Sequence, residues 1–458
     1  MIKMPEKHSV LLKEDECEGC TNCVKNCPTR AIRVLQGKAS IKDDLCIDCA
    51  ECIRTCEYHA KYTQADALDS IKDYSYPVLL VPPSFYGQFN REFTPGQIVH
   101  NLKRLGFKQV FNVARAAEAL SRETATFLQE NDGFYISSSC PVIVRIIQKI
   151  YPELVDHLMP LKSPVEATAQ LARQQIIEQK QIKKEDVGVF FVTPCPAKLT
   201  SVHLSPGLKQ GFLDGAIAVE AVYEKLLPLL ENDADSRELS TESVPYSGII
   251  WGQSGGEADI LNFLQQKQTL SVAGIGEVKK VLEELARDNI TGIRYFELVS
   301  CPEGCVGGVL NVLNPYQATF NIKDLVNEYR EKLAVLPAEK LEYDFSLKPG
   351  FTAEPRGKLD EDMEQALKKL ARLEEEKEIL PGLDCASCGA PDCETLAEDI
   401  VQGKAKRTDC IFMLRQEIQN LAEQISSLTH ELPPVMAENE AKKEDKEEND
   451  RGVDKSES

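Results

Sequence analysis

The most reactive side chains of this sequence are its cysteines, which number sixteen in 458 residues and fall into four groups. In chain order the groups are Cys17, Cys20, Cys23 and Cys27; Cys46, Cys49, Cys52 and Cys56; Cys140, Cys195, Cys301 and Cys305; and Cys385, Cys388, Cys393 and Cys410. Thiolates bind iron and zinc, and clustered cysteines in a reducing compartment are typical of metal sites rather than disulfides. We therefore expect an iron–sulfur protein in which every cysteine is a metal ligand.

The first two groups share one spacing, C-x2-C-x2-C-x3-C, and Pro28 follows the first of them. Bacterial two-cluster ferredoxins have this spacing, and in them the fourth cysteine of each run binds the other cluster. We expect one 4Fe–4S cluster at Cys17, Cys20, Cys23 and Cys56, and a second at Cys46, Cys49, Cys52 and Cys27. A pair of zinc sites is the alternative, but zinc motifs rarely repeat this spacing.

The third group is dispersed along the chain, so the surrounding elements must bring it together. From Pro77 onward, amphipathic segments such as 146–158 and 278–289 separate short apolar runs at 77–84, 109–114, 134–140, 187–195, 215–222, 247–254 and 293–301. Apolar strands that alternate with helices predict an α/β fold with parallel sheets covered on both faces. Cys140, Cys195 and Cys301 end three of these runs. Because α/β sheets place sites beyond the carboxyl ends of strands, we expect these cysteines to meet.

Each central cysteine also lies beside proline, glycine or serine. The contexts are SSSCP at Cys140, TPCPAK at Cys195, and ELVSCPEGCVGG at Cys301 and Cys305. They predict tight turns, whose backbone amides can donate hydrogen bonds to cluster sulfurs. Four buried core thiols are the alternative. The turns favour one 4Fe–4S-type site.

These contexts resemble the three signature segments of FeFe-hydrogenases, and so do LGFKQVF (105–111), YPELVDHL with the later KSP (162–164), and WGQSGG (251–256). The resemblance covers roughly residues 78–320. It implies a two-lobed hydrogenase-type domain with an H-cluster, a 4Fe–4S cubane joined to a di-iron unit. It implies H2 and protons as substrates. It also implies Lys198 as the donor to a cyanide, Cys305 as the bridging ligand, and Cys140, Cys195 and Cys301 as the remaining ligands.

The sequence departs from the family pattern around this cofactor. Ser139 stands where the family has its proton-delivering cysteine. The other departures are Ser201 for a glutamate, Thr193 and Val299 for two methionines, and Met159 or Pro160 for the serine of the usual proton route. A hydroxyl is a far weaker acid than a thiol, so the usual proton relay cannot be fast. The pattern resembles the divergent, sensory hydrogenases often called group D, and Ser139 and Lys198 are our candidate catalytic residues.

Two questions stay open at this point. Glu257 and Glu303 are candidate substitutes for the lost proton carriers, although both are also explained as structural carboxylates. Relatives of the hydrogenase domain serve in cytosolic iron–sulfur assembly without a di-iron unit. The alternative function is therefore a non-catalytic electron-transfer or cluster-assembly protein.

The fourth group reads C-x2-C-x4-C-x16-C, and it resembles a single-cluster iron–sulfur domain of redox-complex and corrinoid-protein subunits. We expect a third accessory 4Fe–4S cluster there, with zinc as the alternative. Leucine and isoleucine then recur at alternating spacings of four and three, at Leu414, Ile418, Leu421, Ile425, Leu428 and Leu432. This heptad seam covers under three heptads, and it could join two copies of the chain or pack on its own domain.

The expected domains follow from these patterns. They are a two-cluster ferredoxin domain (1–75), a hydrogenase-like domain (76–345), a helical linker (346–380), a C-terminal 4Fe–4S domain (381–412), a coiled-coil helix (413–432) and a disordered acidic tail (433–458).

Composition restricts the kinds of partner and the cell compartment that we expect for this protein. The formal net charge of −20 argues against nucleic acid or an anionic membrane as a partner. We see neither a membrane span nor a signal peptide, and therefore expect a cytoplasmic protein. Its expected partner is a redox protein, either a ferredoxin or a signalling protein.

Overall fold

The computed structural model describes residues 7–90, 92–204, 207, 211–232, 245–264, 268–333, 343–354 and 359–430. The chain forms two compact units, residues 1–357 and 358–458, which we describe separately. The boundary lies inside the expected linker. Among the described residues, no helix combines the length and apolar character needed to cross a membrane.

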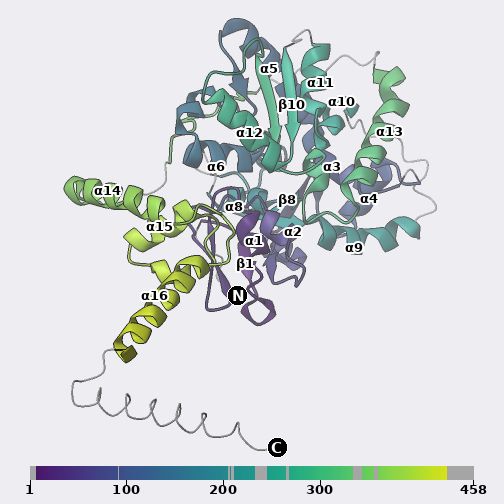
Figure 1. Cartoon of the computed structure of the whole chain (residues 1–458). Coiled ribbons are helices and arrows are strands. Elements are labelled where there is room, and N and C mark those ends of the chain that lie inside the picture. Colours follow the sequence, from purple (N-terminus) through teal and green to yellow (C-terminus); the bar gives the residue numbers. More distant parts are fainter. Residues whose placement is uncertain are drawn as a thin grey trace, which may run out of the picture. The chain divides into compact units, whose positions relative to one another are not determined.

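The ferredoxin domain lies at the start of the first unit, in purple in Figure 1, and consists of two similar halves. Its elements are β1 (Val10–Leu12), α1 (Asn22–Lys25), β2 (Ile32–Leu35), β3 (Lys38–Ile41), α2 (Glu51–Arg54) and β4 (Lys61–Thr63). Strand β1 pairs antiparallel with β4, and β2 with β3. The halves repeat left-handed backbone at positions 29 apart, namely Gly19 and Asp48, Thr21 and Ala50, and Arg30 and His59. The doubled cysteine motif is therefore also a doubled backbone conformation.

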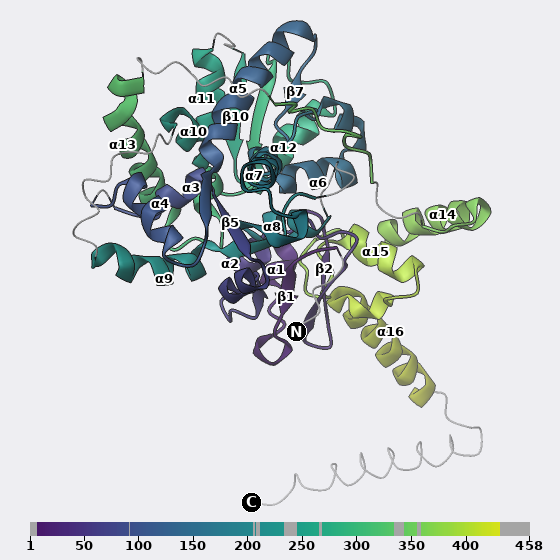
Figure 2. The same ribbon diagram turned by 180° about the vertical axis from the view of Figure 1, so that it is seen from behind.

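A four-stranded parallel sheet forms one lobe of the hydrogenase-like domain. Its strands, in spatial order, are β6 (Gln109–Asn112), β5 (Tyr76–Val81), β8 (Val187–Thr193) and β9 (Gly215–Ala218). Successive side chains of a strand face opposite sides. Leu79 and Phe190 pack with helices α4 (Pro95–Lys103) and α9 (Val219–Glu231), whereas Leu80 and Phe191 pack with α7 (Pro164–Lys180). Helices therefore cover both faces, as Figures 1 and 2 show from opposite sides.

A three-stranded parallel sheet forms the other lobe. Its strands are β10 (Thr269–Ala273), β11 (Tyr295–Val299) and β7 (Tyr135–Ile136). Phe296 and Leu298 of β11 pack with α6 (Pro141–Ile150) and α12 (Ile275–Leu285), while Tyr295 packs with α5 (Val113–Glu130) and α11 (Gly256–Phe263). The expected two-lobed α/β architecture with covered parallel sheets is confirmed.

Several expected elements were wrong in detail. Residues 247–254, expected as a strand, form α10 (Tyr246–Ile249) and the 3-10 turn Ile250–Gly252. A Cβ on Gly248 would lie 1.8 Å from the carbonyl oxygen of Ala114, so the glycine allows this turn to pack on α5. Strand β10 was missed, because all five of its residues are only partly buried and it lacks an apolar run. Periodicity cannot separate a short apolar strand from a short buried helix.

Two other segments change structure within the expected element. Residues 215–222 are a strand only to Ala218, and helix α9 starts at the next residue. In 146–158, helix α6 ends at Ile150, and a 3-10 helix runs from Pro152 to His157. Proline does not fit an α-helix interior, which explains this break.

The second unit is a small helical module. Its helices are α14 (Met363–Ile379), α15 (Cys393–Val401) and α16 (Ile411–His430). Leu373 and Leu380 pack with Leu396, Ile400 and Cys410 in a compact apolar cluster. The buried Glu376 carboxylate accepts hydrogen bonds from Nε (2.7 Å) and Nη2 (3.0 Å) of Arg407. Leu432 and the acidic tail lie outside the described residues.

Candidate functional site

Turns at the ends of three strands hold the central cysteines. Cys140 follows β7 and precedes α6, Cys195 follows β8 and precedes α8 (Pro196–Leu204), and Cys301 follows β11. Cys305 lies in the next turn, the 3-10 segment Gly304–Gly307. Cys140 and Cys305 lie close enough for their charges to act on both Cys195 and Cys301. Both sheets therefore deliver cysteines to one place, as the strand endings predict.

Lys198 points at this cysteine group from α8. Its Nζ donates to Sγ of Cys305 at 3.5 Å. Burial lowers the pKa of Lys198, but the nearby charges of Cys305, Cys195 and Cys140 outweigh burial and raise the pKa overall. Burial raises the pKa of Cys195 to about 11, and Lys198 opposes that rise. A protonated lysine beside sulfur is the arrangement that favours thiolates and other anionic groups.

A cavity adjoins this lysine. Its lining includes Ser138, Ser139, Glu166, Lys198 and Ser201, together with apolar residues of α6 and α8. Both candidate catalytic residues therefore border one space. Glu166 was missed by sequence reasoning. It closes a capping box with Ser163 at the start of α7, and burial raises its pKa.

The residues that depart from the family pattern have other partners. The Thr193 hydroxyl donates to the carbonyl of Cys195 at 2.9 Å, and the Ser201 hydroxyl donates to that of Ala197 at 2.9 Å. Met159 is buried in an apolar cluster beside Tyr295. The hydroxyls of Thr193 and Ser201 therefore support the backbone around Cys195.

A buried carboxyl network lies next to the Cys140 turn. Glu257 accepts hydrogen bonds from the hydroxyls of Ser137 (2.8 Å) and Tyr295. The backbone N–H of Ser139 donates to the same Ser137 hydroxyl at 3.3 Å. Burial raises the pKa of Glu257 to about 7 and also raises that of Glu297, whose oxygens accept backbone N–H groups of α11. Two hydrogen bonds thus connect the Glu257 carboxyl, through the Ser137 hydroxyl, to the backbone N–H of Ser139.

The other candidate carboxylate, Glu303, is placed differently. It has left-handed backbone (φ 59°) at the turn between Cys301 and Cys305, and its side chain accepts a hydrogen bond from Thr319 at 3.4 Å. No described contact links this carboxylate to Ser139. Among the two, Glu257 is the one near the Cys140 turn.

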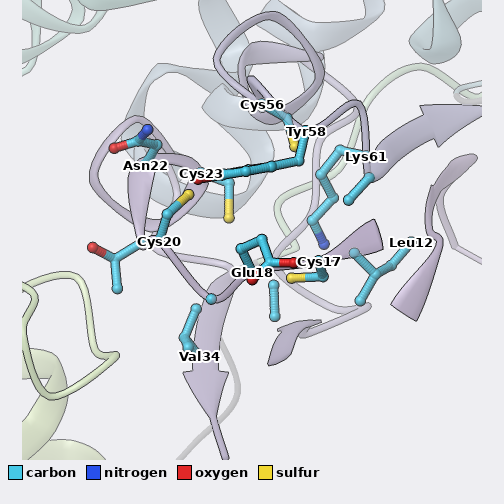
Figure 3. Close-up of a pocket in the computed structure, with 14 residues that line it drawn as sticks. Leu12, Cys17, Glu18, Cys20, Asn22, Cys23, Val34, Cys56, Tyr58 and Lys61 are labelled. Atoms are coloured by element: carbon cyan, nitrogen blue, oxygen red, sulfur yellow. The ribbon is translucent and has the colours of Figure 1, made fainter. Parts of the chain in front are cut away.

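The ferredoxin cysteines separate into two pockets in the exchanged pattern that their spacing predicts. Cys17, Cys20, Cys23 and Cys56 line the first pocket (Figure 3). Cys27, Cys46, Cys49 and Cys52 line the second. Three thiols from one run and one from the other form each pocket, which suits a tetrahedral set of iron–sulfur ligands.

A buried ion pair connects the ferredoxin domain to the hydrogenase-like domain. Nη1 of Arg145, on α6, donates to Oδ2 of Asp48 at 2.5 Å. Asp48 also accepts from the hydroxyl of Thr200 (2.7 Å) and the backbone N–H of Ser9 (2.8 Å). His8, Cys46 and Asp48 approach one another closely enough for a metal ion. Because both oxygens of Asp48 already accept hydrogen bonds, we regard the group as an interdomain contact.

A second link lies nearer the central cysteines. Nη2 of Arg54 donates to the carbonyl of Gly307 at 2.7 Å, and the charge of Arg54 acts on Cys301. Cys49 packs against the same apolar cluster as Cys140 and Cys195. The second ferredoxin pocket is therefore the one close to the central site.

The C-terminal cysteines line a pocket of their own. Cys385, Cys388, Cys393 and Cys410 surround it, and two of them mark the starts of α15 and α16. The backbone N–H of Cys393 donates to Oδ1 of Asp384 at 2.8 Å. Four thiols around one space again suit a metal cluster or a zinc ion.

Three pockets lined by four cysteines each, and a fourth group of cysteines at the strand ends of a mixed α/β domain, define an iron–sulfur protein of the oxidoreductase type. Models of three families match the chain. These are the iron only hydrogenase large subunit, C-terminal domain, at residues 75–205; a 4Fe-4S dicluster domain at 9–57; and an Fe-S cluster domain at 380–412. Residues 75–205 therefore resemble the C-terminal domain of the FeFe-hydrogenase large subunit, and residues 9–57 resemble a two-cluster ferredoxin domain.

Individual relatives are distant. Iron hydrogenase 1 of Clostridium pasteurianum is 24% identical over 257 residues, which are 46% of this chain and 45% of that protein. The periplasmic Fe hydrogenase large subunit of Nitratidesulfovibrio vulgaris is 29% identical over 222 residues, 42% of this chain and 51% of that protein. The chain thus spans about half the length of the curated relatives it matches. The solved FeFe-hydrogenase HydA1 of Chlamydomonas reinhardtii aligns with 61% of this chain and 94% of its own, at 16% identity and a TM-score of 0.44.

Proposed function

We propose that this protein binds an H-cluster and either senses H2 or turns it over slowly, in the reaction H2 ⇌ 2 H+ + 2 electrons. The observation that carries the proposal is Lys198. Its half-buried ammonium faces Cys305 and borders a cavity that Ser139 also lines. A cation withdrawn from part of its water is stabilised by an anionic group, and an H-cluster with cyanide ligands would supply one.

The donor set fits that cofactor. Cys140, Cys195, Cys301 and Cys305 would hold the cubane, with Cys305 as the bridge and Lys198 as donor to a cyanide. When bound, the di-iron unit would supply heterolytic cleavage of H2, while the chain positions it and excludes water.

Proton transfer is where this chain would differ from a fast hydrogenase. Ser139 is a weak acid, so it would pass protons slowly. Glu257, through Ser137, is a buried carboxyl with a pKa of about 7 that can hold a proton near the Cys140 turn. Glu166 borders the cavity itself. We propose these two carboxyls as the proton acceptors that replace the lost relay.

Electrons would leave through the ferredoxin domain. The second pocket is the nearer one to the central cysteines, and the first pocket includes the exposed Cys20. Two ferredoxin clusters and a C-terminal 4Fe–4S cluster at Cys385, Cys388, Cys393 and Cys410 would pass electrons to a redox or signalling protein.

Helix α16 would join two copies of the chain. Its seam has isoleucine at every a position and leucine at every d position, namely Ile411, Leu414, Ile418, Leu421, Ile425 and Leu428, and all six are exposed. Isoleucine at a with leucine at d favours parallel two-stranded coiled coils. Because α16 starts directly after Cys410, a parallel pair would hold two C-terminal clusters side by side.

The second candidate is a non-catalytic iron–sulfur protein without the di-iron unit. The residues that replace the family's glutamate and one of its methionines favour it, since the hydroxyls of Ser201 and Thr193 both donate to backbone carbonyls.

Maturation of the full chain with a di-iron precursor separates the two candidates. Infrared bands of CO and CN, together with H2-dependent reduction of the accessory clusters, are the expected result. Lys198→Met should retain at least tenfold less di-iron unit, because a charge-assisted hydrogen bond contributes about 1.5–3 kcal/mol. Lys280→Met, at an exposed lysine paired with Glu277, is the control and should load normally. Absence of CO and CN bands would favour the non-catalytic protein.

A further inference from the structure

Lys61, in strand β4, is a buried ammonium for which the described residues offer no hydrogen-bond partner. The residue is 3% exposed, and its Nζ belongs to the buried polar atoms that lack a partner. It lines the first ferredoxin pocket, and Figure 3 shows its amino group pointing toward the sulfurs of Cys17 and Cys23. Burying a charge without a partner is costly, so this side chain indicates that a negative group belongs in the pocket.

The internal repeat shows that the two ferredoxin pockets differ at the position of this lysine. The offset of 29 residues that relates the left-handed positions of the two halves places Lys61 on Ile32. Ile32 is 2% exposed and lines the second pocket, just as Lys61 lines the first. The same offset relates Cys27 to Cys56 and Ala31 to Ala60 in these linings. Only one of the two equivalent wall positions carries a charge.

A cation at this position would act on the cluster's charge. A 4Fe–4S cluster bound by thiolates is anionic and becomes more negative when it accepts an electron. Cluster potentials depend on nearby charge and burial, and a positive charge stabilises the reduced state more than the oxidised one.

We infer that Lys61 raises the reduction potential of the first ferredoxin cluster above that of the second and makes it the electron acceptor of the pair. In this step the second cluster is oxidised and the first is reduced by one electron, and no bond forms or breaks. The inference rests on the cluster assignments of the proposed function, but not on H2 turnover. It gives the ferredoxin domain a direction, from the pocket next to the central cysteines toward the pocket with the exposed Cys20.

The test is a redox titration of the full chain, loaded with iron and sulfide but not with the di-iron unit, followed by electron paramagnetic resonance. In Lys61→Met the equilibrium constant for reduction of the first cluster should fall at least tenfold. This corresponds to a reduction potential that is 59 mV lower for one electron. Lys61→Arg should keep the wild-type potential because it keeps the charge. Ile32→Met is the matched control at the second pocket and should leave the first cluster unchanged. Cys20→Ser changes a ligand of the first cluster directly, so the wave with the larger shift in this variant is assigned to that cluster.

Lys61→Gln provides a second neutral variant in case Lys61→Met does not retain its cluster. Unchanged potentials in either neutral variant, with intact iron and sulfide content, would overturn the inference. Because no H2 and no di-iron unit are used, failure of the proposed hydrogenase function leaves this measurement unaffected.

Discussion

Replacing Arg145 by methionine should loosen the ferredoxin domain from the hydrogenase-like domain. The Arg145 side chain is 11% exposed, and that of its partner Asp48 is fully buried. The guanidinium also donates to the carbonyl of Lys7, so it holds two segments of the ferredoxin domain. Methionine preserves most of the apolar contact of the arginine stem and removes only the charge and its hydrogen bonds.

The size of the expected loss in stability follows from the unpaired charge that the substitution leaves on Asp48. Asp48 would keep its hydrogen bonds from Ser9 and Thr200, but its buried charge would lose its counter-ion. Breaking a buried ion pair by removing one partner costs about 3–5 kcal/mol. Arg287→Met is the matched control, because Arg287 is 66% exposed and its contact with Glu284 is 3.5 Å. Exposed pairs contribute at most about 1 kcal/mol.

Urea unfolding of the cluster-loaded chain measures this difference. Visible absorbance reports loss of the iron–sulfur clusters, and the single tryptophan, Trp251, reports unfolding of the hydrogenase-like domain. The shift in midpoint multiplied by the slope m gives the change in the free energy of unfolding. The absorbance transition should move to lower urea in Arg145→Met and stay in place in Arg287→Met.

A double variant makes the reasoning refutable. If the cost arises from an unpaired buried charge, Arg145→Met combined with Asp48→Asn should be more stable than Arg145→Met alone. Equal midpoints for Arg145→Met and Arg287→Met would show that the pair does not hold the domains together.

Three other predictions follow from the same structure. Ser139→Cys should raise H2 evolution by the matured protein up to about 10²-fold, because a positioned acid contributes 10²–10⁴-fold; an unchanged rate would show that the missing thiol is not limiting. The buried Glu257 has a folded pKa of about 7 against an ordinary value of 4.5. Its stabilisation is therefore complete below about pH 4.5 and lost as pH rises through about 7, a loss of about 3 kcal/mol; in pH-dependent unfolding, Glu257→Gln should remove this decline. Ile418→Lys should halve the molar mass measured by light scattering, whereas Gln419→Lys, outside the seam, should not; equal masses would refute a dimer through α16.

The cysteine groups were predictable because short stretches of sequence around the cysteines determine the local backbone. The ferredoxin runs and the turns around the central cysteines are short sequence patterns that fix backbone conformation directly, and strand endings predict which cysteines meet. The parallel sheets were predictable for a similar reason, since β5 and β8 are continuous apolar runs with buried side chains on both faces.

What could not be predicted depends on distant partners. The pairing of Asp48 with Arg145 joins residues 97 positions apart, and neither has a sequence context that marks it. The helix at Tyr246–Ile249 exists because Gly248 packs on Ala114, a contact that the apolar run does not encode. The sequence marks Lys61 as unusual only when the two ferredoxin halves are aligned, because the equivalent residue in the other half is Ile32.

Because each ferredoxin pocket takes one cysteine from the other run, neither pocket can form before most of the domain has been synthesised. Cys56 is part of the first pocket and Cys27 is part of the second. As the chain emerges from the ribosome, neither half can bind its cluster in isolation. The first pocket lacks its fourth thiol until residue 56 has emerged. Oxidative loss of the first cluster would release Cys56, which follows helix α2 closely, and Cys52 of that helix belongs to the second pocket. Metal binding and folding are coupled in so small a domain. We therefore expect the two ferredoxin clusters to be gained and lost together.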